Sequence, residues 1–341
     1  MLMPLFLLYC FPEGNMYRFL ETGSQDADYN LAFEEYVLNR QCADSLLILW
    51  QNDRSVIIGK NQNTFAEVNL PYAEENGIAI VRRMTGGGAV YHDLGNINYS
   101  LICNATEPFD FRDTLQPILA TLHSIGVPAE QSGRNDLILN GKKISGTAAC
   151  ISGGRMLCHG TLLFDTDLDA MAAVLAVDAE KLTAKGIRSV RSRVSNIRET
   201  HYPELSAAEF YALLRRHVLE SGCVPASLSP ADLEEIRTLR ERKYAQWDWT
   251  FGRSSEADII RRRRWEEGSL EAALTVDHGS IKEIRFSGDF LAMKELADVN
   301  RKLCGVPYER NAVDAALADA PLSLYFGGIT KEQILQTLFG D

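Results

Sequence analysis

Apolar residues recur at helical spacing in several segments of the chain. In DADYNLAFEEYVLNR, Leu31, Phe33, Val37 and Leu38 are separated by polar and acidic residues, which predicts a helix with one apolar face. FRDTLQPILATLHSIG is also predicted to be helical, on the condition that Pro117 lies near its first turn. The same spacing predicts later helices at FYALLRRHVLE, ADLEEIRTLRERKY, MKELADVNRKL and TKEQILQTL.

Short apolar runs between the helices predict strands. These runs are SLLILW, SVIIG, GIAIVRR, NINYSLI and HGTLLF. NDLILNGKKISGTA predicts a hairpin that turns at Asn140-Gly141, because this pair readily adopts positive φ angles. Near the C-terminus, RRRRWEEGSLEAALTVDHGSIKEIRF predicts three antiparallel strands with turns at Glu267-Gly268 and His278-Gly279.

Predicted helices dominate before WDWTFG and predicted strands follow it, so we place a domain boundary near residues 246–254. A chain of 341 residues is too long for one typical core and fits two domains. Its formal net charge of -11 argues against nucleic acid as a partner, since proteins that bind nucleic acid usually carry a basic face. The consecutive arginines from Arg261 to Arg264 are therefore interpreted as part of an exposed or edge strand.

The seven cysteines include no C-x-x-C pair, which argues against a zinc site or a disulfide framework and favours a reducing cytoplasm. Residues 1–15 are interpreted as an N-terminal extension, with Met16 as an alternative start. A signal peptide would need a Lys or Arg near its start, and none precedes Arg18 in this chain. The apolar part of this stretch is also too short to span a bilayer, so no membrane partner is expected.

Three consecutive glycines, Gly86, Gly87 and Gly88, follow a predicted strand. The chain has Tyr91 where a G-x-G-x-x-G motif needs its last glycine, and no G-x-x-x-x-G-K-[ST] motif is present. The loop is therefore neither a Rossmann turn nor a P-loop. Two arginines and Thr85 precede the glycines and would offer cations and a hydroxyl to an anionic ligand lying against bare backbone. A hairpin turn or bulge is the alternative interpretation.

Two further segments are rich in cations. SGRNDLILNGKKISGTAA places Asn135, Asp136 and Lys143 around one tight hairpin. If Asp136 and Lys143 lie on adjacent strands, both side chains can face one pocket. TAKGIRSVRSRVSNI, residues 183–197, has little periodicity and is predicted to be a mobile cationic loop. Solvated surface lysines and a solvated linker are the alternatives for these two segments.

The motifs RRMTGGGAVYHDLGN, GRNDLILNGKKISGTA, CHGTLLFD and KGIRSVRSRVSNI, in this order, resemble those of the lipoate–protein ligases. NLAFEEYVL and SVIIGKNQNTFAEVN before them, and WDWTFG after them, are also similar to that family. The resemblance covers about residues 16–341 and is weakest after about residue 255. It implies an α+β fold. A large mixed-sheet domain of the biotin/lipoyl ligase type, similar to class II synthetases, is expected at residues 16–248, and a small C-terminal α/β accessory domain at residues 249–341.

The resemblance implies two half-reactions in a monomeric enzyme. Lipoate and ATP, with Mg²⁺ held through the ATP phosphates, are expected to give lipoyl-AMP and pyrophosphate. The lipoyl group is then expected to move to a specific lysine of an acceptor, such as the glycine cleavage H protein or an acyltransferase subunit of a 2-oxoacid dehydrogenase. Lipoate and octanoate both present an apolar tail and a carboxylate, so the motifs do not distinguish them.

The resemblance also assigns site residues. Lys143 matches the family's central lysine because it precedes Ile144-Ser145-Gly146, and Lys142 is the alternative by one position. This lysine is expected to contact both the lipoate carboxyl group and the α-phosphate. The expected ATP and adenylate contacts are Arg83, Gly88, Ala89, Val90, Tyr91, Lys143, Lys185 and Arg193, the last two in a segment that closes over the adenylate. The expected lipoate contacts are Thr85, where the family commonly has Ser, Gly86, Gly87, Gly88, Lys143 and His159. Supporting roles are expected for Asn135, Asp136 and His92, with Asp136 as a candidate Mg²⁺ ligand.

Three other functions are weaker matches. Octanoyltransferases share the fold but use a cysteine nucleophile. In one branch of these enzymes the cysteine lies three residues before the His-Gly pair, and this chain has Met156 there. In the other branch the cysteine lies near the segment that corresponds to SGRND, which contains no cysteine. A lipoate- or nucleotide-binding protein without turnover would be indicated by loss of Lys143 or Arg83, and both are present. A biotin ligase would carry a GRGRxGR-type loop, which the chain lacks.

Overall fold

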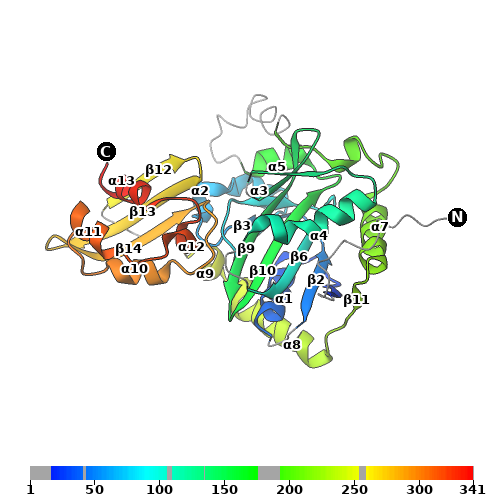
Figure 1. The fold of residues 1–341 in the computed structure, drawn as a ribbon, viewed down its shortest axis with the longest axis horizontal. Coiled ribbons are helices and arrows are strands. Elements are labelled where there is room, and N and C mark those ends of the chain that lie inside the picture. Colours follow the sequence, from blue (N-terminus) through cyan, green and yellow to red (C-terminus); the bar gives the residue numbers. More distant parts are fainter. Residues whose placement is uncertain are drawn as a thin grey trace.

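The computed structural model describes residues 17–40, 44–105, 110–133, 135–175, 193–252 and 259–340. The predicted extension at residues 1–15 and the loop residue Lys185 lie outside this part of the chain. The described residues form a large lobe and a smaller C-terminal lobe, which lie side by side in Figure 1. The two lobes contain separate sheets, as an α+β fold with an accessory domain requires.

The large lobe is built on a mixed eight-stranded sheet with the order β11-β1-β2-β6-β10-β9-β8-β7. Its strands are β1 (Tyr17–Glu21), β2 (Ser45–Trp50), β6 (Asn96–Asn104), β7 (Glu130–Ser132), β8 (Asp136–Leu139), β9 (Lys142–Ser152), β10 (Arg155–Leu163) and β11 (Val224–Pro225). β1 pairs in parallel with β2 and β11, and the remaining neighbours are antiparallel. The predicted hairpin is confirmed, and Asn140 and Gly141 have φ angles of 53° and 77° at its turn.

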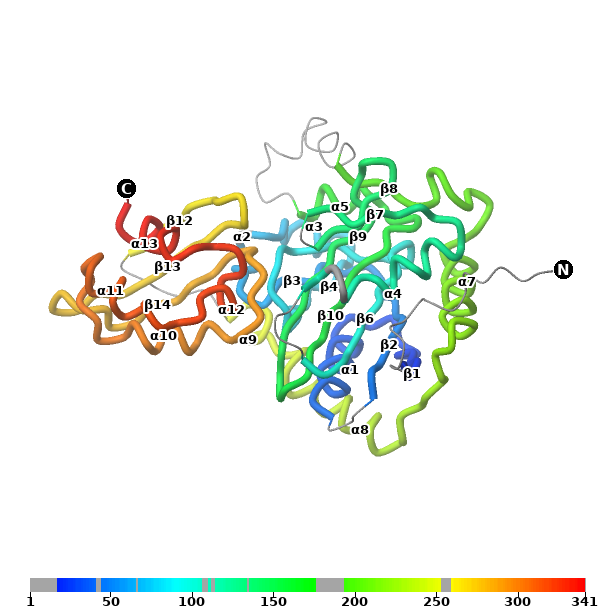
Figure 2. Tube along the Cα trace, in the orientation of Figure 1, coloured from blue at the N-terminus to red at the C-terminus, as the bar shows by residue number. Residues whose placement is uncertain are grey.

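Helices cover both faces of this sheet, as the ribbon and the Cα trace show (Figures 1 and 2). Alternate residues of β2 point to opposite faces. Leu47 and Leu49 pack with α4 (Phe111–Ser124) and α7 (Ala207–Glu220). Leu46 and Ile48 pack with α1 (Ala27–Asn39) and α8 (Pro230–Leu239), which continues into the π-helical turn η4 (Arg240–Tyr244). A strand buried on both faces has to be apolar throughout, which explains the run SLLILW.

A second sheet of three strands, ordered β4-β3-β5, lies beside the first. β3 (Ser55–Ile58) pairs in parallel with β4 (Ala79–Arg82) and antiparallel with β5 (Val90–His92). The predicted strands SLLILW and SVIIG are therefore confirmed, but they belong to different sheets. Short helices pack near this second sheet, namely α2 (Thr64–Glu67), α3 (Leu70–Glu75) and α5 (Leu168–Val174), and the turn η3 (Ile197–Glu199) follows later in the chain. The glycine loop connects β4 to β5.

The small lobe contains the three antiparallel strands that the sequence predicts. They are β12 (Ile259–Trp265), β13 (Gly268–Asp277) and β14 (Ser280–Gly288), and the arginine run lies on the edge strand β12. The sheet has its own core with helices α10 (Ala297–Leu303), α11 (Arg310–Ala316), α12 (Leu322–Phe326) and α13 (Lys331–Phe339). The sequence predicts α10 and α13, whereas α11 and α12 are too short to show a clear period.

The prediction that Pro117 lies near the first turn of its helix is wrong. Pro117 lies in the middle of α4 and not in its first turn. A proline there removes one helical hydrogen bond and costs about 3 kcal/mol. The residue is buried together with Leu115 and Ile118 on the face of α4 that packs on the sheet. Tertiary burial of this face therefore outweighs the local cost, as it generally does for helices in proteins.

The two lobes contact each other through backbone hydrogen bonds at the glycine loop. Gly87 N donates to Phe290 O at 3.0 Å, and Gly288 N donates to Asn61 O at 2.9 Å. Lys60 and Glu295 form an ion pair across the same junction. The glycine loop therefore lies between the large sheet and the small lobe.

Arg82 joins the WDWTFG segment, at the predicted boundary, to the second sheet. Its side chain is fully buried, and Nη1 donates to three backbone carbonyls at residues 59, 60 and 62 at 2.6–3.1 Å. Nε and Nη2 donate to the carbonyl oxygens of Trp249 and Thr250 at 3.0 and 2.7 Å. These two residues belong to α9 (Trp247–Thr250). The WDWTFG segment is thus attached to the large lobe, and the exact boundary at residue 249 stays a prediction.

We expect Arg82→Met to destabilise the protein by about 3 kcal/mol, because it leaves several buried carbonyl groups without a donor. The measurement is urea-induced unfolding followed by tryptophan fluorescence. Arg54→Met is the matched control, because Arg54 is exposed and close to the same sheet. An unchanged unfolding midpoint in Arg82→Met would show that these carbonyl contacts contribute no net stability.

Candidate active site

A cavity of about 170 Å³ lies between the glycine loop and the face of the large sheet that α1 covers. Four strands form its floor. Trp50 of β2 pairs with Asn98 of β6, which pairs with Thr161 of β10, and Thr161 Oγ1 accepts a hydrogen bond from Gly146 N of β9 at 3.2 Å. All four residues line the cavity. The cavity therefore runs across the strands, from β9 to β2.

Lys143 marks the β9 end of the cavity. Its Nζ forms an ion pair with Asp136 Oδ1 at 2.8 Å, and both side chains are partly exposed, at 40% and 33%. Lys143 lines the cavity together with Asn135, whereas Lys142 is not among the lining residues. Adjacent residues of a strand point to opposite faces, so only one of the two lysines can face the cavity. The geometry favours Lys143 over Lys142.

Gly146 explains how the Lys143 side chain passes along the cavity wall. A Cβ atom at Gly146 would lie 3.1 Å from Lys143 Nζ. The ammonium group therefore occupies the space that a side chain at position 146 would fill. This contact explains why a glycine follows the lysine at position 146.

Arg83 shapes the glycine loop. It is 5% exposed, and its Nη2 donates to the carbonyls of Gly86 and Gly88 at 2.6 and 2.9 Å. Nη1 donates to Ile57 O at 3.0 Å and Nε to Thr85 Oγ1 at 2.9 Å. Burial lowers the pKa of Arg83 to about 10, so the group is still a cation at neutral pH. Four of the five N–H donors of Arg83 are thus directed at protein oxygens, and its expected contact with a phosphate stays a prediction.

The three glycines of the loop have different surroundings. A Cβ atom on Gly86 would lie 2.6 Å from Ala292 N and 2.8 Å from Phe290 O. The backbone that approaches Gly86 most closely therefore belongs to the small lobe and not to a ligand. Gly87 has a φ of +87° and lines the cavity beside Leu291, and Gly88 is more open, with Asp289 Cβ at 3.8 Å as its nearest neighbour.

A buried chain of hydrogen bonds extends from Arg83 below the cavity. Thr85 Oγ1 accepts from Arg83 Nε and lies 2.7 Å from His159 Nε2. His159 Nδ1 lies 2.9 and 3.0 Å from the two carboxylate oxygens of Glu34, which is 1% exposed. A neutral His159 that donates from Nδ1 to Glu34 accepts the Thr85 hydroxyl proton at Nε2, so each hydrogen bond has one direction. This chain fixes the ring of His159 in the cavity wall.

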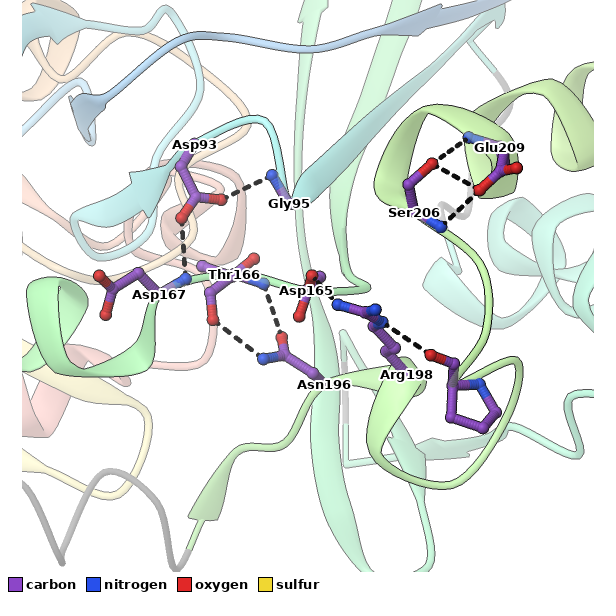
Figure 3. A network of polar contacts seen from close by, with 10 residues as sticks. Asp93, Gly95, Asp165, Thr166, Asp167, Asn196, Arg198, Ser206 and Glu209 are labelled. Carbon is purple, nitrogen blue, oxygen red and sulfur yellow. Dashed lines mark hydrogen bonds and ion pairs between the residues drawn. The ribbon is translucent and has the colours of Figure 1, made fainter.

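The C-terminal end of the predicted cationic loop is tied to the residues that follow β10 (Figure 3). Asn196 accepts from Thr166 N at 3.0 Å and donates to Thr166 O at 2.9 Å, and Arg198 forms an ion pair with Asp165. Ser195 N also donates to Lys143 O at 3.1 Å. The C-terminal end of the loop therefore contacts the backbone of Lys143.

The structure brings together most of the predicted site residues. Arg83, Gly87, Gly88, Ala89, Val90, His92, Asn135, Lys143 and His159 line the cavity. Thr85, Gly86, Tyr91, Asp136 and Arg193 are described but are not among its lining residues, and Lys185 lies outside the described residues. Tyr91 lies in β5 with its side chain in the core of the second sheet, and the expected ATP contact of its backbone stays a prediction.

Sequence reasoning missed other residues of the site. These include Leu31, Trp50, Ile57, Asn98, Thr161 and Leu291 in the lining, and Glu34 below it. Glu34 had a usable signal, because it is an acidic residue on the apolar face of the predicted helix. Leu291 had none, since nothing local in the sequence shows that the small lobe reaches the cavity.

The cysteines near the cavity have no nucleophilic character. Burial raises the pKa of Cys150 to about 12 and that of Cys158 well above its usual value. A reactive cysteine needs a populated thiolate, so both thiols are unsuitable as nucleophiles. Neither residue lines the cavity, and the position where a transferase would carry its cysteine is the buried Met156.

Within the described ranges, no cluster of three or more His, Cys, Asp and Glu side chains is arranged to hold a metal ion. The helices of the same ranges include none with the length and apolar character needed to cross a membrane. Asp136, the candidate Mg²⁺ ligand, is paired with Lys143.

Known proteins match both lobes. A family model described as the lipoyl protein ligase A/B catalytic domain matches residues 26–219, and one described as the bacterial lipoate protein ligase C-terminus matches residues 254–338. The chain is 40% identical over 321 residues to lipoate-protein ligase LplJ of Bacillus subtilis, covering 92% of this chain and 97% of that protein.

Two solved structures have a similar fold. A bipartite lipoate protein ligase from Thermoplasma acidophilum, studied with its E2 lipoyl domain, is 32% identical with a TM-score of 0.62 and covers 72% of this chain and 99% of that one. A lipoate-protein ligase A bound with ATP is 30% identical with a TM-score of 0.59 and covers 70% and 98% of the two chains. The predicted fold class is confirmed.

The buried chain at Thr85 gives a stability prediction. We expect Thr85→Val to cost about 2 kcal/mol, because it leaves Arg83 Nε and His159 Nε2 without a partner in a fully buried position. Thr85→Ser keeps the hydroxyl and is expected to change stability by less than about 1 kcal/mol. Thermal and urea unfolding of the two variants check this difference. Equal stability of the two would contradict the assigned hydrogen bonds.

Proposed function

Because this chain belongs to the lipoate–protein ligase family, we propose that it is an ATP-dependent ligase that forms lipoyl-AMP and then transfers the lipoyl group to a protein lysine. The observation that carries this proposal is the placement of Lys143 at one end of an otherwise largely apolar cavity. A carboxylic acid with an apolar tail matches that distribution of charge, and ATP contributes the second anion.

In the first half-reaction, a lipoate carboxylate oxygen attacks the α-phosphorus of ATP. The new bond joins this oxygen to phosphorus, and the bond to the pyrophosphate oxygen breaks. Both reactants are anions, so a fixed cation between them lowers the barrier. Lys143 is proposed to supply that cation, and its Nζ is held 2.8 Å from Asp136 Oδ1 in an ion pair.

In the second half-reaction, the amine of an acceptor lysine attacks the lipoyl carbonyl and AMP leaves. Lys143 is proposed to polarise this carbonyl and to stabilise the departing phosphate oxygen. The acceptor ammonium must first lose a proton, for which solvent or the phosphate suffices. The acceptors we propose are lipoyl domains, including the H protein and acyltransferase subunits of 2-oxoacid dehydrogenases.

The glycine loop is proposed to hold the adenylate through the backbone of Gly88, Ala89 and Val90, which line the cavity. Arg83 is a positioning residue in this scheme, because it fixes the loop through the carbonyls of Gly86 and Gly88. Lys185 and Arg193 are proposed to approach the adenylate from the cationic loop, whose far side returns to Lys143. Thr85 and His159 are proposed to support the lipoyl end.

Mg²⁺ is proposed to arrive with ATP and to neutralise phosphate charge. The donor set supports no protein cage, since the described residues contain no cluster of metal-ligating side chains and Asp136 already pairs with Lys143. The ion would then depend mainly on phosphate oxygens and water. A monomer in a reducing cytoplasm stays a prediction.

We expect Lys143→Ala to reduce lipoate-dependent pyrophosphate release by at least about 100-fold, because the cation between the two reacting anions is lost. Lys142→Ala is the matched control, since this neighbouring lysine does not line the cavity. Pyrophosphate release is measured with a coupled assay, and circular dichroism checks that both variants fold. Normal release by Lys143→Ala, or equal losses in the two variants, would contradict the assigned role.

We expect Gly87→Val to weaken lipoate binding at least about tenfold. Its side chain would start 3.0 Å from Arg83 Nη2 and 3.1 Å from Leu291 Cδ2, at the cavity wall. Gly154→Val is the control, because its φ of +77° imposes similar backbone strain and a Cβ there would meet nothing within 4 Å. Isothermal titration calorimetry gives the two affinities. Unchanged affinity in Gly87→Val would show that the loop does not border the lipoate site.

A further inference from the structure

Strand β9 carries one extra residue next to Lys143. Consecutive residues of β8 pair with Ser145 and Lys143, which leaves Ile144 as the extra residue of a β-bulge. In a regular strand Lys143 and Gly146, three positions apart, would point to opposite faces. The bulge brings them to one face, where a Cβ atom at Gly146 would lie 3.1 Å from Lys143 Nζ. The direction of the Lys143 side chain therefore depends on an irregular part of the sheet.

The other edge of β9 supports this irregular part. Pairing between β9 and β10 spans residues 147–152, so within the described chain β10 does not pair with Lys143. Val194 lies there instead and forms a parallel bridge with Lys143. Ser195, which is 7% exposed, donates its backbone N–H to Lys143 O at 3.1 Å. Residues 194 and 195 thus hold the Lys143 backbone from the side opposite β8.

Asn196 fixes these two residues in place, as Figure 3 shows. Its Oδ1 accepts a hydrogen bond from Thr166 N at 3.0 Å, and its Nδ2 donates to Thr166 O at 2.9 Å. Asparagine suits this position because its short side chain presents one acceptor group and one donor group together. The amide therefore pairs with both backbone groups of one residue, as a neighbouring antiparallel strand would.

Thr166 is a firm anchor because both of its neighbours are tied to the turn after β5 (Figure 3). Asp165 N donates to Gly95 O at 2.9 Å, and Asp167 N donates to Asp93 Oδ2 at 2.8 Å. Asp93 Oδ1 accepts from Gly95 N at 2.9 Å and closes the turn. Because β5 follows the glycine loop, this anchor belongs to the same part of the fold as that loop.

We propose that Asn196 is a positioning residue for Lys143. By tying residues 194 and 195 to Thr166, it keeps the bulged part of β9 in the geometry that directs the lysine ammonium into the cavity. The inference rests on the proposed role of Lys143 and adds a residue that is not among those lining the cavity. A displacement of about 1 Å at a reacting group can reduce a rate about 100-fold, so loss of this support is expected to lower turnover.

The first test measures lipoate-dependent pyrophosphate release by Asn196→Ala. We expect kcat to fall at least about tenfold and KM for lipoate to change less than about threefold, because the cation is displaced and not removed. Ser206→Ala is the matched control, since it also removes two side-chain hydrogen bonds, at the start of α7. We expect this control to lose a similar amount of stability in urea unfolding and to keep the wild-type kcat. A wild-type kcat in a folded Asn196→Ala would overturn the inference.

The second test combines Asn196→Ala with Lys143→Ala. If Asn196 acts through Lys143, its removal matters little once the lysine is gone, and we expect less than about a twofold further loss of rate. A residue that only stabilises the fold would lower the rate by the same factor with and without the lysine. Equal factors in the two backgrounds would therefore overturn the inference.

Asn196→Asp covers the case in which Asn196→Ala does not fold. It keeps the size of the side chain and the acceptor for Thr166 N, but it loses the donor to Thr166 O. We expect a lower kcat that again depends on the presence of Lys143. In that case a wild-type kcat in Asn196→Asp would contradict the positioning role.

The results separate this inference from the proposed function. Slow release by Lys143→Ala together with a normal kcat in Asn196→Ala would overturn the inference and leave the role of Lys143 intact. Absence of lipoate-dependent pyrophosphate release by the wild-type enzyme would instead refute the proposed function, and this inference with it.

Discussion

The site depends on the buried guanidinium of Arg83. Its contacts with the carbonyls of Gly86 and Gly88 hold a loop that has almost no side chains of its own to fix it. A cation removed from water needs such partners, and flexible glycines need such a cation. The same group connects through Thr85 and His159 to the carboxylate of Glu34 on α1. Loop, sheet and helix are thereby joined in one charged network beneath the cavity.

The cavity combines a partly exposed polar end with a buried tail region. At Lys143 and Asp136 the side chains remain accessible, as the proposed reaction with ATP and an acceptor lysine requires. Toward the other end of the cavity, Trp50 and His92 are buried. Leu291 of the small lobe completes this wall, so the position of that lobe affects the tail region directly.

Much of the fold follows from the sequence, because strands such as SLLILW and the turns at Asn140-Gly141 and His278-Gly279 have strong local signals. The position of Lys143 at the cavity was predictable from its motif, and the structure adds that its side chain uses the space at Gly146. Pro117 and Arg83 were not predictable in detail. The helix around Pro117 is set by burial against the sheet, and the partners of Arg83 are carbonyls, which every sequence contains. Leu291 reaches the cavity only through the packing of two lobes.

The central claim is that the enzyme attaches lipoate to a protein lysine at the expense of ATP. The most direct measurement is mass spectrometry of an unlipoylated H protein incubated with the enzyme, lipoate and ATP, beside a reaction without ATP that contains octanoyl carrier protein. The account predicts a lipoyl mass increase that requires both ATP and free lipoate. Modification from the octanoyl carrier alone would contradict it and would identify an acyltransferase.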